Sequence, residues 1–209
     1  MKNLLDTCVA ELAAGIDRFP WESATAYADW LAQTYYYVRH STRLLATAGG
    51  RFAMDERGNA LHHRFASHMS EEKKHELLCV HDIKQIGHSI DTLPEHPSTR
   101  MFYEPQYYKI EHEHPIALFG YILPLEAIGP TSGGAIIEKV GAAHGDKCVS
   151  FLKLHSEEDV DHLDKALHML ASIPEAEQRL VEENMRQTTY AYVAMLVDIR
   201  RRADARPRG

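Results

Sequence analysis

The sequence predicts an all-α domain, and three observations lead to this prediction. Apolar residues recur at helical spacing through most of the 209-residue chain. Capping residues and glycine or proline stops separate these segments. The one stretch with β-type residues, "DKCVSFLKL" at 146–154, would be a lone strand without a partner. We therefore expect about seven or eight helices in a single domain over 1–209, with a frayed basic tail from about 203 to 209.

The N-terminal half contains three expected helices. The first is indicated by apolar residues at every third or fourth position: Leu5, Val9, Leu12 and Ile16. The second is expected to run from the N-cap candidate Ser23 to Gly49, and the third from a cap at Asn59 to Gly87.

The C-terminal half is expected to begin with a loop over 91–100 and a helix near 101–110. An apolar helix should follow over 115–130, with a kink at Pro124 and a stop at the Gly-Pro pair that closes it. A short helix over 132–145 and two helices near 155–172 and 175–202 complete the chain.

Composition excludes several function classes. The formal net charge of −7 and the absence of a basic stripe argue against a nucleic-acid partner. No 18-residue apolar run is present, so we expect no membrane association, and the start "MKNLLDTCVAELAAG" does not resemble a secretory signal. Three scattered cysteines form neither a zinc pattern nor a disulfide framework, which favours a cytoplasmic location.

Two histidines and four acids fall within eight residues in "HSEEDVDH", at 155–162. On a helix, Asp159 lies about 40° from His155 on one side and His162 about 20° on the other, so the three share one face. This face borders the apolar stripe, which makes the three side chains candidate ligands of a metal ion. The alternative is an acidic helix start that the helix dipole favours.

A second segment, 62–87, places His68, Glu72 and His75 inside its own apolar stripe. A buried carboxylate without a counter-charge costs several kcal/mol, and no lysine or arginine of this helix faces the same way. Metal ligation explains the pattern, and histidines satisfied by hydrogen bonds are the alternative. Glu72 and His75 form the Glu-x-x-His pair of two-metal sites in helical bundles. His68 is either a further ligand or a histidine behind the ligands.

A carboxylate from a third helix is expected to complete the site. Glu126 is the candidate because it is the only acid in the apolar run at 115–130, just after the possible kink at Pro124. The alternative is an exposed acid at a helix end. Histidine and carboxylate ligands without a thiolate suit Fe(II) or Mn(II) better than structural zinc.

Together the two motifs resemble those of the heme-oxygenase-like diiron oxidases, iron-containing redox enzymes related to the TenA thiaminases and the PqqC cofactor oxidases. The segment "HMSEEKKHELLCVHDIKQIG" resembles the central helix of that family, and "SFLKLHSEEDVDHLDKALHML" resembles its late ligand helix. The resemblance extends roughly from Tyr27 to Tyr192. It implies a seven-helix bundle, often a homodimer, with two iron ions that activate O2. It assigns metal positions to Glu72, His75, Glu126, His155, Asp159 and His162.

The sequence departs from the family at one point. Many members carry a further glutamate upstream of the central histidine, where this chain reads "YVRHS" at 37–41 and has no acid. Either Glu126 takes the place of that glutamate, or the second iron is weakly held or absent. His40 is a further candidate ligand.

The resemblance implies an iron-dependent oxidoreductase that uses O2 as co-substrate. Its substrate would be a small amine- or amino-acid-derived metabolite, changed by N-oxygenation or oxidative C–C cleavage, and no catalytic residue beyond the metal ligands is predicted. Candidate substrate contacts are Tyr37, Arg39 and Tyr121, with core aromatics and exposed cations as the alternative interpretation.

Two other functions remain open from sequence. One is a metal-free TenA-like hydrolase, whose nucleophile would be Cys79 on the ligand face of the central helix. The other is a heme-binding helical protein with one histidine as axial ligand.

Overall fold

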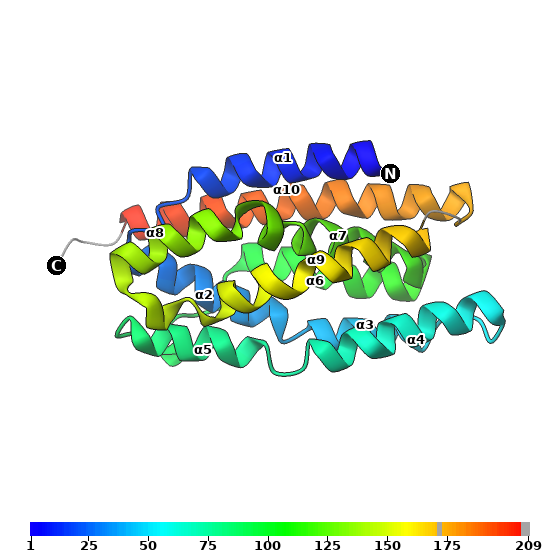
Figure 1. The fold of residues 1–209 in the computed structure, drawn as a ribbon, viewed down its shortest axis with the longest axis horizontal. Coiled ribbons are helices and arrows are strands. Elements are labelled where there is room, and N and C mark those ends of the chain that lie inside the picture. Colours follow the sequence, from blue (N-terminus) through cyan, green and yellow to red (C-terminus); the bar gives the residue numbers. More distant parts are fainter. Residues whose placement is uncertain (171–172, 206–209) are drawn as a thin grey trace.

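The computed structural model describes residues 1–170 and 173–205; within the helix at 150–170, the side chains of 157–162, 164 and 165 are outside the description. The described chain is all-helical, as predicted (Figure 1). The α-helices are α1 (Lys2–Asp17), α2 (Ala24–Val38), α3 (Ser41–Gly49), α4 (Glu56–Glu71), α5 (Glu76–Gln85), α6 (Pro97–Tyr108), α7 (Phe119–Glu126), α8 (Gly134–His144), α9 (Ser150–Leu170) and α10 (Glu175–Ala205). Short 3-10 turns lie at Ile90–Thr92, Pro115–Leu118 and Asp146–Cys148, and π-helical turns at Lys109–Glu113 and Gly129–Gly133.

The helices form an elongated bundle. Helices α1 and α10 lie side by side along one edge, whereas α3, α4 and α5 form the opposite edge (Figure 1). Helix α10 also packs against α2, α6 and α7, and α9 packs against α5 and α7. None of the described helices is both long enough and apolar enough to cross a membrane.

Helix α7 approaches α10 so closely that only glycine fits at one position. A Cβ atom at Gly120 would lie 2.2 Å from the Val181 carbonyl oxygen and 2.8 Å from the Met185 backbone nitrogen. Both are backbone atoms of α10, which cannot move aside as the end of a side chain can. Gly120 therefore allows the two helices to bury their apolar faces at short distance.

Two segments that the sequence predicted as continuous helices are interrupted. The expected helix from Ser23 to Gly49 divides into α2 and α3 at Arg39 and His40. The expected helix over 59–87 starts earlier, where the Asp55 carboxylate accepts a hydrogen bond from the Gly58 backbone N–H at 2.7 Å, and it divides into α4 and α5. If each divided helix is counted once, the described chain has eight helices.

The break between α4 and α5 is sharp. Its Lys74 has a φ of +75°, which no other non-glycine residue in the described part of the chain shares. The left-handed conformation is unfavourable for lysine. No glycine or proline marks this position in the sequence, so packing of α4 against α3 and of α5 against α2, rather than local preference, accounts for the break.

Four other predicted boundaries are wrong. Helix α6 begins at Pro97, inside the expected loop over 91–100. The apolar helix does not stop at the Gly-Pro pair, because a π-helical turn over Gly129–Gly133 joins α7 to α8. Helix α9 begins at Ser150 instead of near 155. Helix α10 continues through Ala205, beyond the expected start of a frayed tail at 203.

Candidate metal centre

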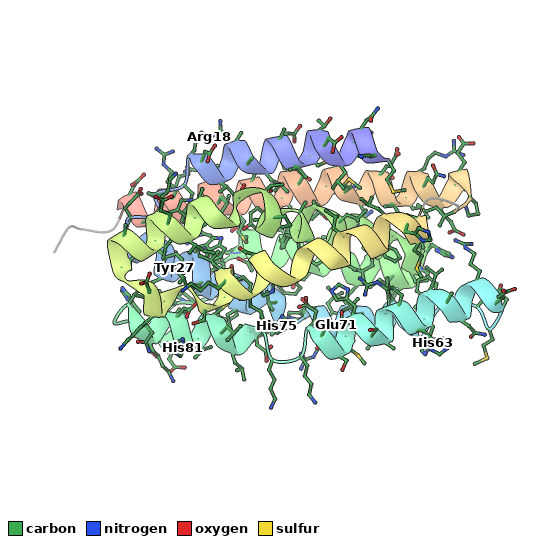
Figure 2. The ribbon with its side chains drawn as sticks, in the orientation of Figure 1. Arg18, Tyr27, His63, Glu71, His75 and His81 are labelled. Carbon is green, nitrogen blue, oxygen red and sulfur yellow. The ribbon has the colours of Figure 1, made fainter. Side chains whose placement is uncertain are left out.

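The break between α4 and α5 supplies two of the predicted ligands. Glu72 is the C-terminal cap of α4 and His75 the N-terminal cap of α5. Figure 2 shows His75 at the junction of the two helices, across from Glu71 at the end of α4. The sequence predicted that the Glu-x-x-His pair lies on one face of a continuous helix. In the structure the pair lies in a tight turn between two helices.

Helix α9 brings His155 to this turn. Ligand atoms of Glu72, His75 and His155 all lie within 4.8 Å of one another. The Phe151 carbonyl oxygen lies 2.9 Å from His155 Nδ1. A carbonyl only accepts hydrogen bonds, so Nδ1 carries the proton and Nε2 is left with its lone pair for a ligand.

The local electrostatics favour metal-binding forms of these groups. Burial raises the pKa of the Glu72 carboxyl, but a hydrogen bond from His68 and the imidazoles of His68, His155 and His75 outweigh burial and lower this pKa to about 2. Burial lowers the pKa of His155. An ionised carboxylate and a neutral imidazole are the forms that bind metal ions.

Glu126 joins the same cluster through His68. Both side chains are buried, and His68 Nε2 lies 3.2 Å from Glu126 Oε1 and 3.5 Å from Glu72 Oε1. Glu126 is thus not an exposed acid at a helix end. His68 contacts carboxylates that come from two different helices.

Two other candidate ligands are outside the described side chains, and a third lies elsewhere in the structure. The side chains of Asp159 and His162 lie outside the described residues, so their role stays a prediction. His40 stacks on Tyr103 with ring centroids 4.0 Å apart, and its Nδ1 lies 2.8 Å from the Tyr107 hydroxyl oxygen. It is not part of the described cluster of Glu72, His75 and His155.

Two cavities adjoin the cluster, of about 100 Å³ and 60 Å³. They share four lining residues: Ser41, Glu72, Leu125 and Glu126. Tyr37 lines the larger cavity and Tyr121 the smaller one. Arg39 lines neither, because its guanidinium lies over the rings of Tyr35 and Tyr36.

The Tyr121 hydroxyl has no hydrogen-bond partner among the described residues, although it is buried. Buried polar groups in folded proteins are nearly always paired. A hydroxyl in this state, on the wall of a cavity beside two carboxylates, is available to a bound molecule.

A family model described as "iron-containing redox enzyme" matches residues 28–195. The chain belongs to this family of iron-containing redox enzymes. None of the curated proteins matches the sequence.

Two solved structures have the same fold as this family member. A domain of unknown function with a heme oxygenase-like fold from Shewanella denitrificans OS217 superposes with a TM-score of 0.83 at 18% identity, covering 97% of this chain and 93% of the other. A TenA homologue from Pseudomonas syringae pv. tomato DC3000 superposes with a TM-score of 0.78 at 11% identity, covering 95% and 91%. The predicted heme-oxygenase-like, TenA-like fold is thereby confirmed.

The donor set fits the metal named by the family. Two imidazoles and one carboxylate, from Glu72, His75 and His155, are the ligand types with which non-heme Fe(II) oxygenases bind iron while leaving coordination positions open. No thiol joins them, since Cys8, Cys79 and Cys148 line neither cavity.

Cys79 does not have the surroundings of a nucleophile. It is fully buried, and burial together with the nearby Asp82 carboxylate raises the pKa of its thiol well above the ordinary value. An activated thiol requires a lowered pKa and access to substrate. Cys79 also lines neither of the two cavities beside the cluster.

Several cavity residues were missed by sequence reasoning. Trp30, Phe151, Ser156 and Tyr192 line the larger cavity, but their apolar or helical surroundings gave no signal in the sequence. Gly133 lines it too, and a Cβ atom there would lie 2.1 Å from Ser156 Oγ, next to His155. The Gly-Gly pair at 133–134 was the available signal for this close approach to α9.

Proposed function

We propose that this protein is a non-heme iron oxidase or oxygenase that uses O2 to oxidise a small amine- or amino-acid-derived metabolite, by N-oxygenation or oxidative C–C cleavage. One observation carries the proposal: Glu72, His75 and His155 bring two imidazoles and a carboxylate to one partly buried point beside a largely apolar cavity. This ligand composition is typical of iron sites that react with O2.

The residues divide into holding and shaping roles. Glu72, His75 and His155 would hold iron, and Glu126 with the predicted ligands Asp159 and His162 would complete a two-metal site. Bound iron would supply the one-electron and O2 chemistry that side chains lack. The Phe151 carbonyl orients His155, and His68 orients the carboxylates of Glu72 and Glu126.

The surrounding residues would control the substrate. The apolar walls of the larger cavity would limit the contact of the reacting centre with water once a substrate is bound. The unpaired Tyr121 hydroxyl would donate a hydrogen bond to a bound molecule in the smaller cavity.

The first test is metal content. Protein loaded anaerobically with Fe(II) and freed of excess metal should retain iron, and the Glu72→Ala variant should lose it. Glu126→Ala should lower the iron stoichiometry without unfolding the protein. His63→Ala is the control, because His63 is exposed on α4 outside the cluster. Equal iron content in all four proteins would contradict the proposal.

The second test is O2 consumption. Iron-loaded protein mixed with O2 and a panel of small amines and amino acids should consume O2 in a substrate-dependent manner. Equally fast turnover without iron and without O2 would contradict the oxygenase proposal and favour the hydrolase. A heme function would need one histidine as axial ligand in an apolar pocket, whereas two histidines and a carboxylate converge on one point here.

A further inference from the structure

Helix α9 begins without a capping side chain of its own. Val149 precedes the helix, and its carbonyl oxygen accepts a hydrogen bond from the Lys153 backbone N–H at 2.9 Å. A valine side chain cannot accept a hydrogen bond, so the N–H groups of the first turn need an acceptor from elsewhere. Asp82 of α5 supplies one, because its Oδ2 accepts from the Phe151 backbone N–H at 2.9 Å. The cap of α9 therefore comes from a different helix.

Asp82 is a costly residue for this purpose. Its side chain is fully buried, and none of the ion pairs among the described residues joins it to a lysine or arginine. The exposed imidazole of His81 lies 3.0 Å from its other oxygen, Oδ1. Burial of a carboxylate is unfavourable, whereas an uncharged serine or asparagine just before α9 could cap the helix from within the chain. The link between α5 and α9 therefore needs a reason beyond the cap.

Phe151 connects this link to the cluster, because it contacts His155 in two ways. Its carbonyl oxygen lies 2.9 Å from His155 Nδ1, and its ring stacks on the imidazole with centroids 4.0 Å apart. The carbonyl determines which nitrogen carries the proton, and the ring limits rotation of the imidazole. A group that fixes Phe151 thus also fixes the direction of His155 Nε2.

Helix α5 consequently acts on both histidines of the cluster. His75 at its N-terminal cap contributes directly, and Asp82 reaches His155 through Phe151. Helices α5 and α9 pack against each other, and the rings of His75 and His155 lie with centroids 5.1 Å apart (Figure 1). Metal ligands must be held within about 0.5 Å of their working geometry. A direct bond between the two helices sets the separation of ligands that each helix carries.

We infer that Asp82 is a positioning residue of the metal centre, which fixes His155 relative to His75 through the backbone and ring of Phe151. Asp82 lines neither cavity and is not part of the cluster of ligand atoms, so it would contact neither metal nor substrate. The inference rests on the proposed function for the metal, but the state of the His155 imidazole can be measured without metal.

The first test is metal affinity, measured on the full chain with Fe(II) and Co(II) by anaerobic competition with a chromophoric chelator. Asp82→Ala should weaken both affinities about 10- to 100-fold, the usual effect of losing a group behind a ligand. It should also change the visible absorption of bound Co(II), which depends on ligand geometry. Asp82→Asn keeps an oxygen that can accept from the Phe151 N–H, so affinity should stay within about threefold of the parent.

Asp29→Ala is the matched control. Asp29 is also a buried carboxylate that joins two helices, since its Oδ1 lies 3.3 Å from Nε2 of His96, the N-terminal cap of α6. Asp29→Ala should lower stability to urea, as Asp82→Ala does, but leave metal affinity per folded molecule unchanged. If Asp82→Ala does not fold, Asp82→Ser replaces it, because its shorter side chain cannot reach Phe151. Equal affinity losses at both positions, or none at Asp82, would overturn the inference.

The second test uses the metal-free protein. In a chain with isotope-labelled histidine, nitrogen NMR identifies the ring signals of His155 as those missing from His155→Ala. They should show one tautomer, protonated on Nδ1, in the parent and in Asp82→Asn, and an average of both tautomers in Asp82→Ala. Identical His155 signals in the parent and Asp82→Ala would overturn the inference.

The two tests separate the positioning role from the iron function. Ring signals that respond to Asp82→Ala in a protein that binds neither metal would support the positioning of His155 and contradict the iron enzyme. Tight iron binding that is insensitive to Asp82→Ala would support the iron enzyme and contradict the role of Asp82.

Discussion

Two polar clusters inside this bundle both combine histidine with a carboxylate, and they differ in what surrounds them. One is the cluster of Glu72, His75 and His155 at the break between α4 and α5. The other joins Asp29 and Gln33 of α2 to His96 and Thr99 at the start of α6.

The α2–α6 cluster is closed by hydrogen bonds within the protein. The Gln33 amide nitrogen donates to Asp29 Oδ1 at 2.9 Å and to the Pro94 carbonyl at 3.1 Å, and its oxygen accepts from the His96 backbone N–H and the Thr99 hydroxyl. His96 Nε2 lies 3.3 Å from Asp29 Oδ1. This cluster lines neither of the two cavities, and it joins the two helices.

The metal-type cluster instead opens onto two cavities that its own carboxylate lines. Burial of histidine beside carboxylate is therefore not what marks a site in this protein. The distinguishing feature is convergence of several ligand atoms next to space that another molecule can occupy. The predictions below test this difference, from the largest expected effect to the smallest.

Gln33→Leu should cost the most stability. This substitution removes the side chain that hydrogen-bonds to both the buried Asp29 carboxylate and the Thr99 hydroxyl. We expect the free energy of unfolding to fall by roughly 3–5 kcal/mol. Urea denaturation measures the loss. Iron bound per folded molecule should not change; a Gln33→Leu protein as stable as the parent would show that this cluster does not hold the helices.

His155→Ala should have the opposite effect to Gln33→Leu, with a large loss of iron affinity and a small loss of stability. It removes a ligand, so we expect iron affinity to fall at least about 100-fold, or about 2.7 kcal/mol, with a smaller change in the stability of the metal-free protein. Competition with a chromophoric chelator measures the affinity, and His63→Ala is the matched exposed control. Unchanged affinity in His155→Ala would remove α9 from the proposed site.

Alkaline pH should destabilise the protein through its buried tyrosines. Burial raises the pKa of Tyr192 to about 12 from an ordinary value near 10, and the raised value means that the unfolded state releases the proton first. The stability that the protonated, buried Tyr192 contributes is fully present below pH 10. It is lost as the pH rises to about 12, and we expect the loss to be roughly 2–3 kcal/mol. Denaturation midpoints between pH 9 and 12 measure it, and the slope should be shallower in Tyr192→Phe.

Two tyrosine variants compare a buried hydroxyl that is hydrogen-bonded within the protein with one that has no described partner. They should show the smallest effects. Tyr27→Phe removes a buried hydroxyl that donates to the Cys148 carbonyl at 2.7 Å, so we expect a loss of about 1–2 kcal/mol. Tyr121→Phe removes a hydroxyl without a described partner and should change stability by less than about 0.5 kcal/mol. Tyr121→Phe should weaken the binding of a small molecule in the smaller cavity. Tyr27→Phe should leave that binding unchanged. Equal stability losses would mean that Tyr121 is paired in solution.

The sequence by itself determined the all-α class, most of the helices and the candidate ligands Glu72, His75, Glu126 and His155. These follow from local information, because the helical period sets which side chains share a face and an acid inside an apolar run is visible without coordinates. Asp159 and His162 rest on the same reasoning, and the ligand role of all six residues remains a prediction.

Only the tertiary structure decided how those residues meet. The turn at 72–75 has no glycine or proline, and packing of α4 on α3 and of α5 on α2 accompanies a Lys74 conformation that lysine's own preferences oppose. That turn brings Glu72 and His75 to the cluster, whereas Cys79 is buried and lines neither cavity. The cavity walls come from helices far apart in the chain, such as Trp30 of α2 and Tyr192 of α10. Their proximity depends on long-range packing, which a local sequence pattern does not encode.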